Sequence, residues 1–347
     1  MELVKWVNPI SSRRSHGGRA GFGVAAVRFA ATVGLWPCVA CPALAQDVGK
    51  APLVGVLLIN AAANPEPVVP LFRKALAALG YVEGRNLHLD FRFAEGHAER
   101  FPALAEALVR DKADVIVTLG DAAARAAQQA TKTIPIVAIA DDLVAAGLIQ
   151  SMVKPGGNTT GVSILATELD AKKLEVLKEI VPAARRFGLL RDPASSTEAR
   201  LAAIAAMARA LGLELQTVDV ESPADFAGAF AGLRAGGAEA LDILASPLLA
   251  NFERELVRLS LEYRLPSICQ FREMVEAGCL VSYGVKRSEM YAMLAAYTDK
   301  MLKGAKPGDT VAQQPSVVEL VINRKTARKI GIEIPSAILA RADEVIE

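Results

Sequence analysis

The segment that decides the fold spans residues 114–140 and reads DVIVTLGDAAARAAQQATKTIPIVAIA. It begins with a continuous apolar run, which is typical of a strand that helices cover on both faces. An Ala-rich stretch from Ala122 to Ala130 predicts a helix, and a second apolar run follows from Ile134 to Ala140. Pro135 lies near the start of this second strand, where a missing N–H costs least. Two strands joined through a helix by short connections predict parallel α/β architecture.

The same alternation continues on both sides of this segment. On its N-terminal side, strand patterns at 52–59 and 87–93 flank a helical pattern at 66–79. On its C-terminal side, a short strand is expected at 158–163, and a second series of units then begins. In this series Ser195 and Glu198 have the spacing of a capping box, which predicts a helix start. The strand patterns of the second series lie at 186–190, 213–220, 240–245, 267–269 and 279–283.

Two series of similar build predict two open parallel-sheet lobes, with helices on both faces and a cleft between them. About 300 residues outside the N-terminal leader are enough for two lobes of ordinary size. We expect lobe 1 to contain residues 51–162 and about 285–312. Lobe 2 is then expected to contain residues 163–284 and about 313–347.

Residues 1–45 are typical of a secretory signal peptide. A basic front precedes a mostly apolar run at 29–36, and an Ala-Leu-Ala triplet ends at Ala45 in the small-x-small pattern of cleavage sites. The sequence therefore predicts export to the periplasm with cleavage near Ala45. A lipoprotein signal that uses Cys38 or Cys41 is the alternative.

The charge balance argues against nucleic-acid binding. The full chain has 39 Lys and Arg residues and 38 Asp and Glu residues. Removal of the five basic residues and one acidic residue of the leader leaves 34 and 37, a net charge of −3. A nucleic-acid-binding surface is usually marked by clustered excess positive charge, so we expect no nucleic-acid partner.

Signals for catalysis and for metal binding are absent from the sequence. The chain has no Gly-x-Ser-x-Gly elbow and no Walker loop. After the leader only His88 and His97 remain of the histidines, and no Cys/His group has metal-ligand spacing. Cys269 and Cys279 either form a disulfide, as exported cysteines can, or are two separate buried thiols. We expect no enzyme activity, no cofactor and no metal.

Polar residues follow the predicted strands, and ligands of open parallel sheets bind beyond the carboxyl ends of strands. Asp141 follows the fourth predicted strand and is the first choice as a partner of a ligand ammonium group. Its alternative role is to cap the segment that begins near Leu143, because Asp is also a common helix N-cap. The residues at these strand ends are Asn60, Ala61, Gly120, Asp121, Ala122, Asp141, Asp142, Arg191, Asp192, Ser246, Gln270, Phe271, Arg272 and Tyr283.

Short motifs along residues 52–347 resemble those of a known family. They include PGGNTTGVS at 155–163, FREMVEAG at 271–278 and ELVINRKTA at 319–327. The remaining motifs lie at 79–86, 114–120, 144–148, 282–284, 302–307 and 342–347. Together they resemble the substrate-binding proteins of ABC transporters, in the branch often labelled tryptophan/tyrosine-type.

This resemblance implies a type I periplasmic-binding-protein-like fold, in which three segments of the chain cross between the lobes. The implied hinge lies near 161–163, at 283–285 and around 312–315. Among the strand-end residues, the resemblance places ligand contacts at Asn60, Gly120, Asp121, Ala122, Asp141, Ser246, Phe271 and Arg272, and it adds Ser163. This chain departs from the family pattern at Asp121, where relatives usually carry Ser or Thr, and at Asp142, where they usually carry Pro. A carboxylate at position 121 repels a ligand carboxylate and favours a ligand with an amine, unless Asp121 turns away to cap its helix.

The resemblance also implies the function. We expect an extracytoplasmic solute-binding receptor of an ABC importer, which closes on a small amino-acid-like or amine-bearing ligand between its lobes. Its expected partners are that ligand, an ABC permease and the ATPase of the permease, and the receptor itself is expected to be a monomer. The alternative is a ligand-sensing periplasmic module that signals to a membrane partner.

Overall fold

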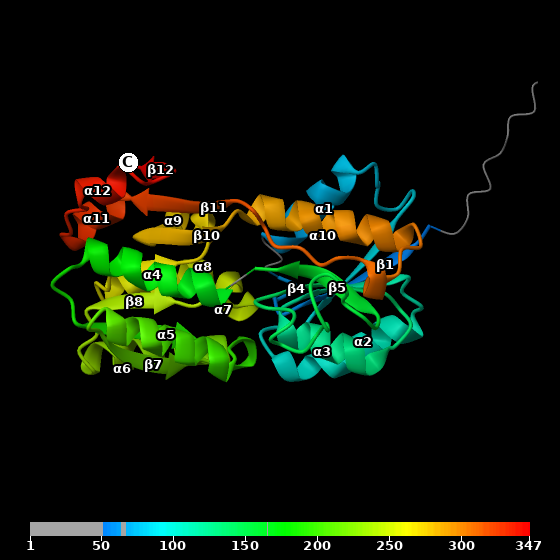
Figure 1. The fold of residues 1–347 in the computed structure, drawn as a ribbon, viewed down its shortest axis with the longest axis horizontal. Helices are drawn as coiled ribbons and strands as arrows, with labels where there is room; N and C mark the ends of the chain where they lie inside the picture. Colours follow the sequence, from blue (N-terminus) through cyan, green and yellow to red (C-terminus); the bar gives the residue numbers. More distant parts are fainter. Residues whose placement is uncertain (1–50, 64–66, 165) are drawn as a thin grey trace, which may run out of the picture. The chain divides into compact units, whose positions relative to one another are not determined.

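The computed structural model describes residues 51–63, 67–164 and 166–347, which carry two separate β-sheets (Figure 1). Residues 49–347 form one compact unit that contains both sheets. The predicted signal peptide lies outside the described residues. None of the helices in the described ranges is long and apolar enough to cross a membrane.

The first sheet forms the centre of lobe 1. It contains five parallel strands in the order β2-β1-β3-β4-β5. The strands are β1 (Leu53–Leu58), β2 (His88–Phe93), β3 (Val115–Leu119), β4 (Ile136–Ala140) and β5 (Thr159–Ser163). Every residue of β3 and β4 is buried, which agrees with the continuous apolar runs that predicted them.

Four helices pack against the first sheet, and one of them comes from far along the chain. They are α1 (Val68–Ala78), α2 (Phe101–Arg110, after the short 3₁₀ turn η1 at Ala98–Arg100), α3 (Asp121–Ala130) and α10 (Arg287–Leu302). α10 lies beside α1 and contacts β3, β4 and β5. Lobe 1 therefore combines N-terminal strands with a helix that follows most of the second lobe in sequence.

The second sheet has seven strands in the order β12-β11-β10-β9-β8-β6-β7. They are β6 (Arg186–Arg191), β7 (Glu214–Asp219), β8 (Ala240–Ile243), β9 (Ser267–Cys269), β10 (Val281–Val285), β11 (Val318–Asn323) and β12 (Glu344–Ile346). The helices of this lobe are α4 (Ala166–Ile180), α5 (Glu198–Ala210), α6 (Phe226–Ala235), α7 (Pro247–Asn251), α8 (Glu253–Glu262), α9 (Arg272–Ala277), α11 (Arg324–Ile330) and α12 (Ser336–Leu339). Three 3₁₀ turns complete the described elements, η2 (Pro193–Ser195), η3 (Pro223–Asp225) and η4 (Pro307–Asp309).

The predicted fold class of two α/β lobes is confirmed, with one antiparallel pair as an addition. β10 leaves the second sheet toward α10 of lobe 1, and β11 returns from lobe 1 into the same sheet. Because the two strands connect to the same neighbouring lobe in opposite senses, they pair antiparallel. The other strand pairs of both sheets are parallel.

The predicted capping box at Ser195 is wrong. The N-cap of α5 is Thr197, whose side chain accepts a hydrogen bond from the backbone N–H of Arg200 at 3.2 Å. Ser195 belongs to the preceding turn η2 and donates its hydroxyl hydrogen to Asp192 Oδ2 at 2.9 Å. The motif spacing in the sequence begins two residues before the true N-cap. Ser195 does not cap α5 because its hydroxyl is bound to Asp192, a charged and therefore stronger acceptor.

Candidate functional site

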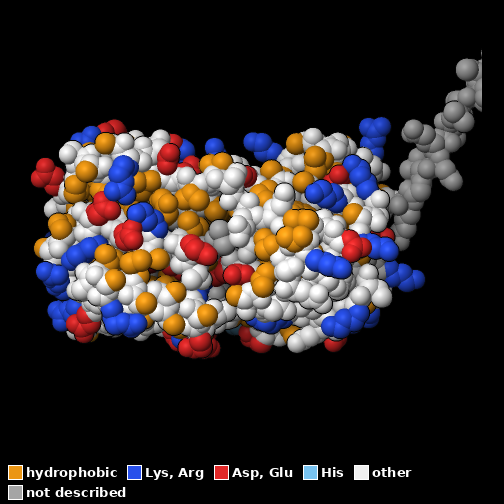
Figure 2. Space-filling model, viewed as in Figure 1, with side chains coloured by type: hydrophobic (Ala, Val, Ile, Leu, Met, Phe, Trp, Pro, Cys, Tyr) orange, Lys and Arg blue, Asp and Glu red, His pale blue; other side chains and the backbone are white. Residues whose placement is uncertain are grey.

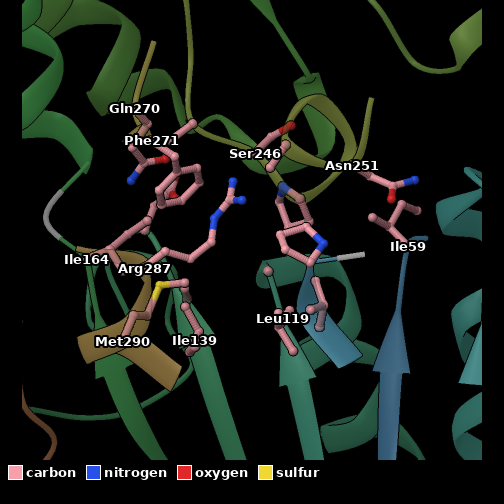
Figure 3. Close-up of a pocket in the computed structure, with 18 of the residues that line it drawn as sticks. Ile59, Leu119, Ile139, Ile164, Ser246, Asn251, Gln270, Phe271, Arg287 and Met290 are labelled. Carbon is pink, nitrogen blue, oxygen red and sulfur yellow. The ribbon is translucent and has the colours of Figure 1, made fainter. Parts of the chain in front are cut away.

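A pocket lies between the two lobes at the carboxyl ends of the first sheet (Figure 3). Ile59, Leu119 and Ile139 reach it from the ends of β1, β3 and β4. The second lobe contributes Ser246, which follows β8, and Phe271, which follows β9. The space open to the centres of water molecules is about 70 Å³. One water needs only about 10–15 Å³ by this measure, so the pocket has room for a small molecule.

The walls of this pocket are mainly apolar, with a small number of polar groups. Apolar walls with few polar groups are the usual composition of a small-molecule site. Apolar side chains come from both lobes and from α10, whose first turns contribute Met290 and Tyr291. The polar lining residues are Asn60, Asp141, Ser246, Asn251, Gln270 and Arg287.

Five of the nine residues chosen from the sequence line this pocket. They are Asn60, Gly120, Asp141, Ser246 and Phe271. Ser246 is also the N-cap of α7, because its hydroxyl oxygen accepts a hydrogen bond from the backbone N–H of Leu249 at 3.0 Å. Residues chosen at the strand ends of both lobes therefore line the same cavity.

The other four chosen residues lie outside the pocket lining. Asp121 is the first residue of α3, is buried, and approaches Arg125 at 3.8 Å. Ala122 lines a smaller neighbouring hollow beside Asp192. Ser163 supports the loop that carries Asp141, since its hydroxyl donates to the Asp141 carbonyl at 3.4 Å and accepts the Leu143 N–H at 3.2 Å.

Arg272 is the clearest departure from the sequence prediction. It begins α9 but turns away from the pocket. Its Nε donates to Glu276 at 2.8 Å and its Nη2 donates to Glu344 at 2.7 Å. Two carboxylates on the outside of lobe 2 therefore hold this guanidinium, and Arg272 is not among the residues that line the pocket.

The sequence left two roles open for Asp141, contact with a ligand and capping of the segment that follows, and in the structure Asp142 takes the capping role. Asp142 Oδ1 accepts hydrogen bonds from the backbone N–H groups of Val144 at 2.9 Å and Ala145 at 3.0 Å. Asp142 thus caps the turn that follows β4. Asp141 faces the pocket, and its Oδ2 accepts a hydrogen bond from Nη1 of Arg200 in lobe 2.

Arg200 was not found from the sequence, and it is the centre of a buried ion network. It is only 2% exposed. Its Nε donates to Asp170 Oδ2 at 2.7 Å, and its Nη1 also reaches the carbonyls of Ser195 at 3.0 Å and Ala245 at 3.2 Å. The guanidinium therefore joins α4, α5 and the end of β8 to the strand-end loop of lobe 1.

The network continues into the core of lobe 2 through Lys173. The Lys173 ammonium lies 3.0 Å from Asp170 Oδ1 and 2.7 Å from Asp242 Oδ1. These three side chains are 0–1% exposed. Lys and Glu are interspersed with apolar residues along α4, so the sequence pattern did not reveal this burial. Buried charges of this kind are stable only when they are paired and hydrogen-bonded.

Burial dominates the electrostatics of Asp141. It raises the pKa of Asp141 to about 7, although Arg200 acts in the opposite direction; the carboxylates of Asp121, Asp170 and Asp192 add to the rise. Burial also raises the pKa of Asp121. Carboxylates of both lobes, Asp121 and Asp141 of lobe 1 and Asp170 and Asp192 of lobe 2, thus surround one guanidinium, that of Arg200.

Two further contacts join the lobes beside the pocket. The side-chain amide of Asn60 donates a hydrogen bond to Asn251 Oδ1. Gly120 has φ +90°, and a Cβ at this position would lie 2.6 Å from Cγ of Pro247. Glycine is therefore required here both by its backbone conformation and by the close approach of lobe 2.

Arg287 is a second arginine that the sequence did not reveal, and it lines the pocket. It is 4% exposed, and its Cζ lies 4.0 Å from the centre of the Phe271 ring. Its guanidinium projects into the space between Phe271 and Ser246 (Figure 3). Nη2 donates to Glu253 at 3.1 Å. The sequence predicted that the preceding strand ends at residue 283, whereas β10 runs to Val285 and Arg287 begins α10 two residues later.

The remaining features of the described residues give no second type of chemistry. Cys269 and Cys279 are buried and not bonded to each other, and Cys279 Sγ lies 3.3 Å from Ser267 Oγ. Among the described residues, no group of three or more His, Cys, Asp or Glu is placed to hold a metal ion. On the face shown in Figure 2, Lys and Arg side chains are interspersed with Asp and Glu.

Comparison with known proteins agrees with this architecture. Residues 66–346 match the family described as ABC transporter substrate binding protein, and the chain belongs to this family. The family is one of solute-binding receptors, not of enzymes. A curated relative from Clostridioides difficile is named tyrosine-binding protein; it is 27% identical over 268 residues, which are 77% of each chain.

Two solved structures extend the comparison. A conserved domain protein from Vibrio cholerae has a TM-score of 0.78 and 28% identity, and the match covers 85% of this chain and 100% of the other. An ABC domain from Streptococcus pneumoniae in complex with L-Trp has a TM-score of 0.75 and 26% identity, and the match covers 86% of this chain and 100% of the other. Both matches span the two lobes.

Proposed function

We propose that this protein is the extracytoplasmic receptor of an ABC importer and that it holds a small amino-acid-like ligand between its lobes. The observation that carries the proposal is the pocket itself. Its apolar walls come from both lobes, and Asp141 provides a carboxylate at the end of β4. A ligand with an apolar body and an ammonium group fits this combination.

The ligand class follows from the lining and from the relatives. Asp141 Oδ2 is held by Arg200, which leaves its other carboxylate oxygen to accept a hydrogen bond from a ligand ammonium. The apolar surfaces of Ile59, Leu119, Ile139 and Phe271 suit an aromatic or branched side chain. The relatives named for tyrosine and solved with L-Trp support an aromatic amino acid as the first candidate.

The proposed mechanism is hinge closure. We assign residues 51–162 and about 285–312 to lobe 1, and 163–284 with about 313–347 to lobe 2. A ligand that contacts both lobes favours the closed arrangement because its affinity for that arrangement is higher. The closed receptor would then deliver the ligand to a permease driven by a cytoplasmic ATPase. The signal peptide expected at residues 1–45 would supply export to the periplasm.

The test combines ligand recovery with transport. Protein purified from its own periplasm is analysed by native mass spectrometry, and thermal shift is measured with aromatic amino acids and small amines. We expect a retained or added ligand to raise the melting temperature by mass action. Deletion of the gene should abolish uptake of that ligand. Unchanged uptake together with loss of a ligand-dependent membrane response would favour the sensing module, and no ligand in either assay would contradict both functions.

A further inference from the structure

Arg287, which lines the pocket, has a hydrogen-bond donor that no group in the described part of the chain uses. Nη1 of Arg287 has no hydrogen-bond partner among the described residues, and its nearest carboxylate oxygen, on Glu273, is 3.5 Å away with unsuitable geometry. A buried guanidinium with an unpaired N–H is costly to leave unsatisfied. The side chain is 96% buried and lines the pocket, so the missing acceptor would come from a molecule inside it.

The glutamates beside Arg287 approach from another direction. Glu253 and Glu273 line an adjoining open hollow that shares Pro67 and Asn251 with the pocket, but neither glutamate belongs to the lining of the pocket. They therefore hold the guanidinium from outside, and Phe271 covers one of its faces. These contacts restrain Arg287, whose guanidinium lines the pocket and projects into the space between Phe271 and Ser246 (Figure 3).

Other donors lie at the same end of the cavity. Arg287 begins the 16-residue helix α10, whose N-terminal turn lines the pocket through Arg287, Met290 and Tyr291. The N-terminus of a helix favours negative charge. Gln270 Nε2, on the opposite lobe, also lacks a hydrogen-bond partner among the described residues. Among the lining residues, the buried side-chain atoms without a hydrogen-bond partner are Arg287 Nη1, Gln270 Nε2 and Asn251 Nδ2, which are all donors.

We propose that Arg287 binds the carboxylate of the ligand, with Gln270 as a second donor from lobe 2. This inference rests on the proposed receptor function and names the group that the ligand must carry. The ligand is then a small apolar or aromatic carboxylic acid, with its amine directed to Asp141. A planar guanidinium suits a carboxylate better than a single point charge does. The ligand carboxylate contributes more than the ligand amine to the choice between ligands, because Arg200 already neutralises much of the charge of Asp141.

Three indole compounds separate the carboxylate from the amine. L-tryptophan has both groups, tryptamine lacks the carboxylate and 3-indolepropionate lacks the amine. We expect calorimetry of the wild-type protein to show at least tenfold tighter binding of the two acids than of tryptamine. Arg287→Met should weaken the binding of the two acids by about 30-fold or more and leave tryptamine binding within about twofold.

The control variant is Arg272→Met. Arg272 is a neighbouring arginine with carboxylate partners outside the pocket, so this change should leave the ratio of acid to amine affinity unchanged. Because Arg287→Met also removes a partner from Glu253, the variant can fail to fold. Gln270→Glu then replaces a donor by a carboxylate of the same size, and it should weaken the acids more than tryptamine.

The outcomes are distinct. Wild-type binding of tryptamine as tight as that of L-tryptophan overturns the inference alone. If Arg287→Met folds and its ratio of acid to amine affinity equals that of wild type, the inference is also overturned. If Arg287→Met does not fold, an unchanged ratio in Gln270→Glu overturns it. If the wild-type protein binds none of the three compounds and no ligand is recovered from periplasm, the proposed function fails, and the inference fails with it.

Discussion

Asp141 of lobe 1 and Arg200 of lobe 2 form an ion pair at the edge of the pocket, although they are 59 residues apart in sequence. Arg200 also holds Asp170, and Asp170 holds Lys173. The pocket is thus connected to the core of lobe 2 by a continuous line of alternating charges. A charge removed at one end leaves its neighbour buried without compensation, which makes the network testable by mutation.

Loss of Arg200 should destabilise the protein strongly. Arg200→Ala leaves Asp170 and Asp141 without their shared cation, and breaking a buried pair from one side costs about 3–5 kcal/mol in the free energy of unfolding. Urea denaturation measures this change. Arg258→Ala is the control, because Arg258 and Glu262 are an exposed pair on α8 and such pairs contribute about 0–1 kcal/mol. A loss below about 1 kcal/mol for Arg200→Ala would show that the network adds little.

Asp141 should give the stability a distinctive pH dependence. Its folded pKa, about 7, lies above the ordinary value of 3.8, so the folded state binds more protons than the unfolded chain between these values. Stability from this group therefore falls as pH rises through that window. The free energy of unfolding of Asp141→Asn minus that of wild type should therefore increase as pH rises from about 4 to 7, because only the wild type loses this stabilisation.

The control for this pH dependence is Asp225→Asn. Backbone N–H groups of Glu221 and Ser222 lower the pKa of Asp225, so this group contributes stability above the ordinary pKa and loses it at lower pH. Its variant should show no growing advantage between pH 4 and 7. Parallel stability curves for wild type and Asp141→Asn across the window would mean that the Asp141 carboxyl group titrates normally.

The two neighbouring aspartates should have separate phenotypes. Asp142→Ala removes a cap and should cost about 0.5–2 kcal/mol of unfolding free energy, with little change in affinity. Asp141→Ala removes the proposed ammonium partner and should cost about 2–5 kcal/mol of binding free energy. Calorimetry with L-tryptophan and apo melting of both variants provide the comparison. Equal affinities of the two variants would contradict the assignment of Asp141 to the ligand.

Gly120→Ala should impair closure of the lobes. The added methyl group would lie 2.6 Å from Pro247, a clash that exists only when the lobes meet, and overpacking of this kind costs about 1–3 kcal/mol. Affinity for L-tryptophan should fall accordingly, and small-angle scattering should show less compaction with ligand. Gly147→Ala is the matched control, because Gly147 also has positive φ, at +68°, but nothing lies within 4 Å of its added Cβ. Equal effects of the two changes would indicate backbone strain alone.

The sequence by itself determined the two lobes and five of the residues that line the pocket. Local hydrophobic patterns encode buried strands such as β3 and β4. The rule that ligands bind at strand ends, narrowed by the family resemblance, selected Asn60, Gly120, Asp141, Ser246 and Phe271. These inferences work because hydrophobic periodicity and the residues that follow a strand are local properties of the sequence. The family motifs gave the same architecture.

Only the tertiary structure decided which charges are buried and which face the ligand. Arg200, Lys173 and Arg287 belong to helices whose patterns place them no differently from surface residues, and their partners lie on elements distant in sequence. The same is true of Arg272, which the sequence placed in the site but which pairs with Glu344 on the outside of lobe 2. A long charged side chain is stable in the core only beside a partner of opposite charge. That partner is in place only after segments distant in sequence have folded together.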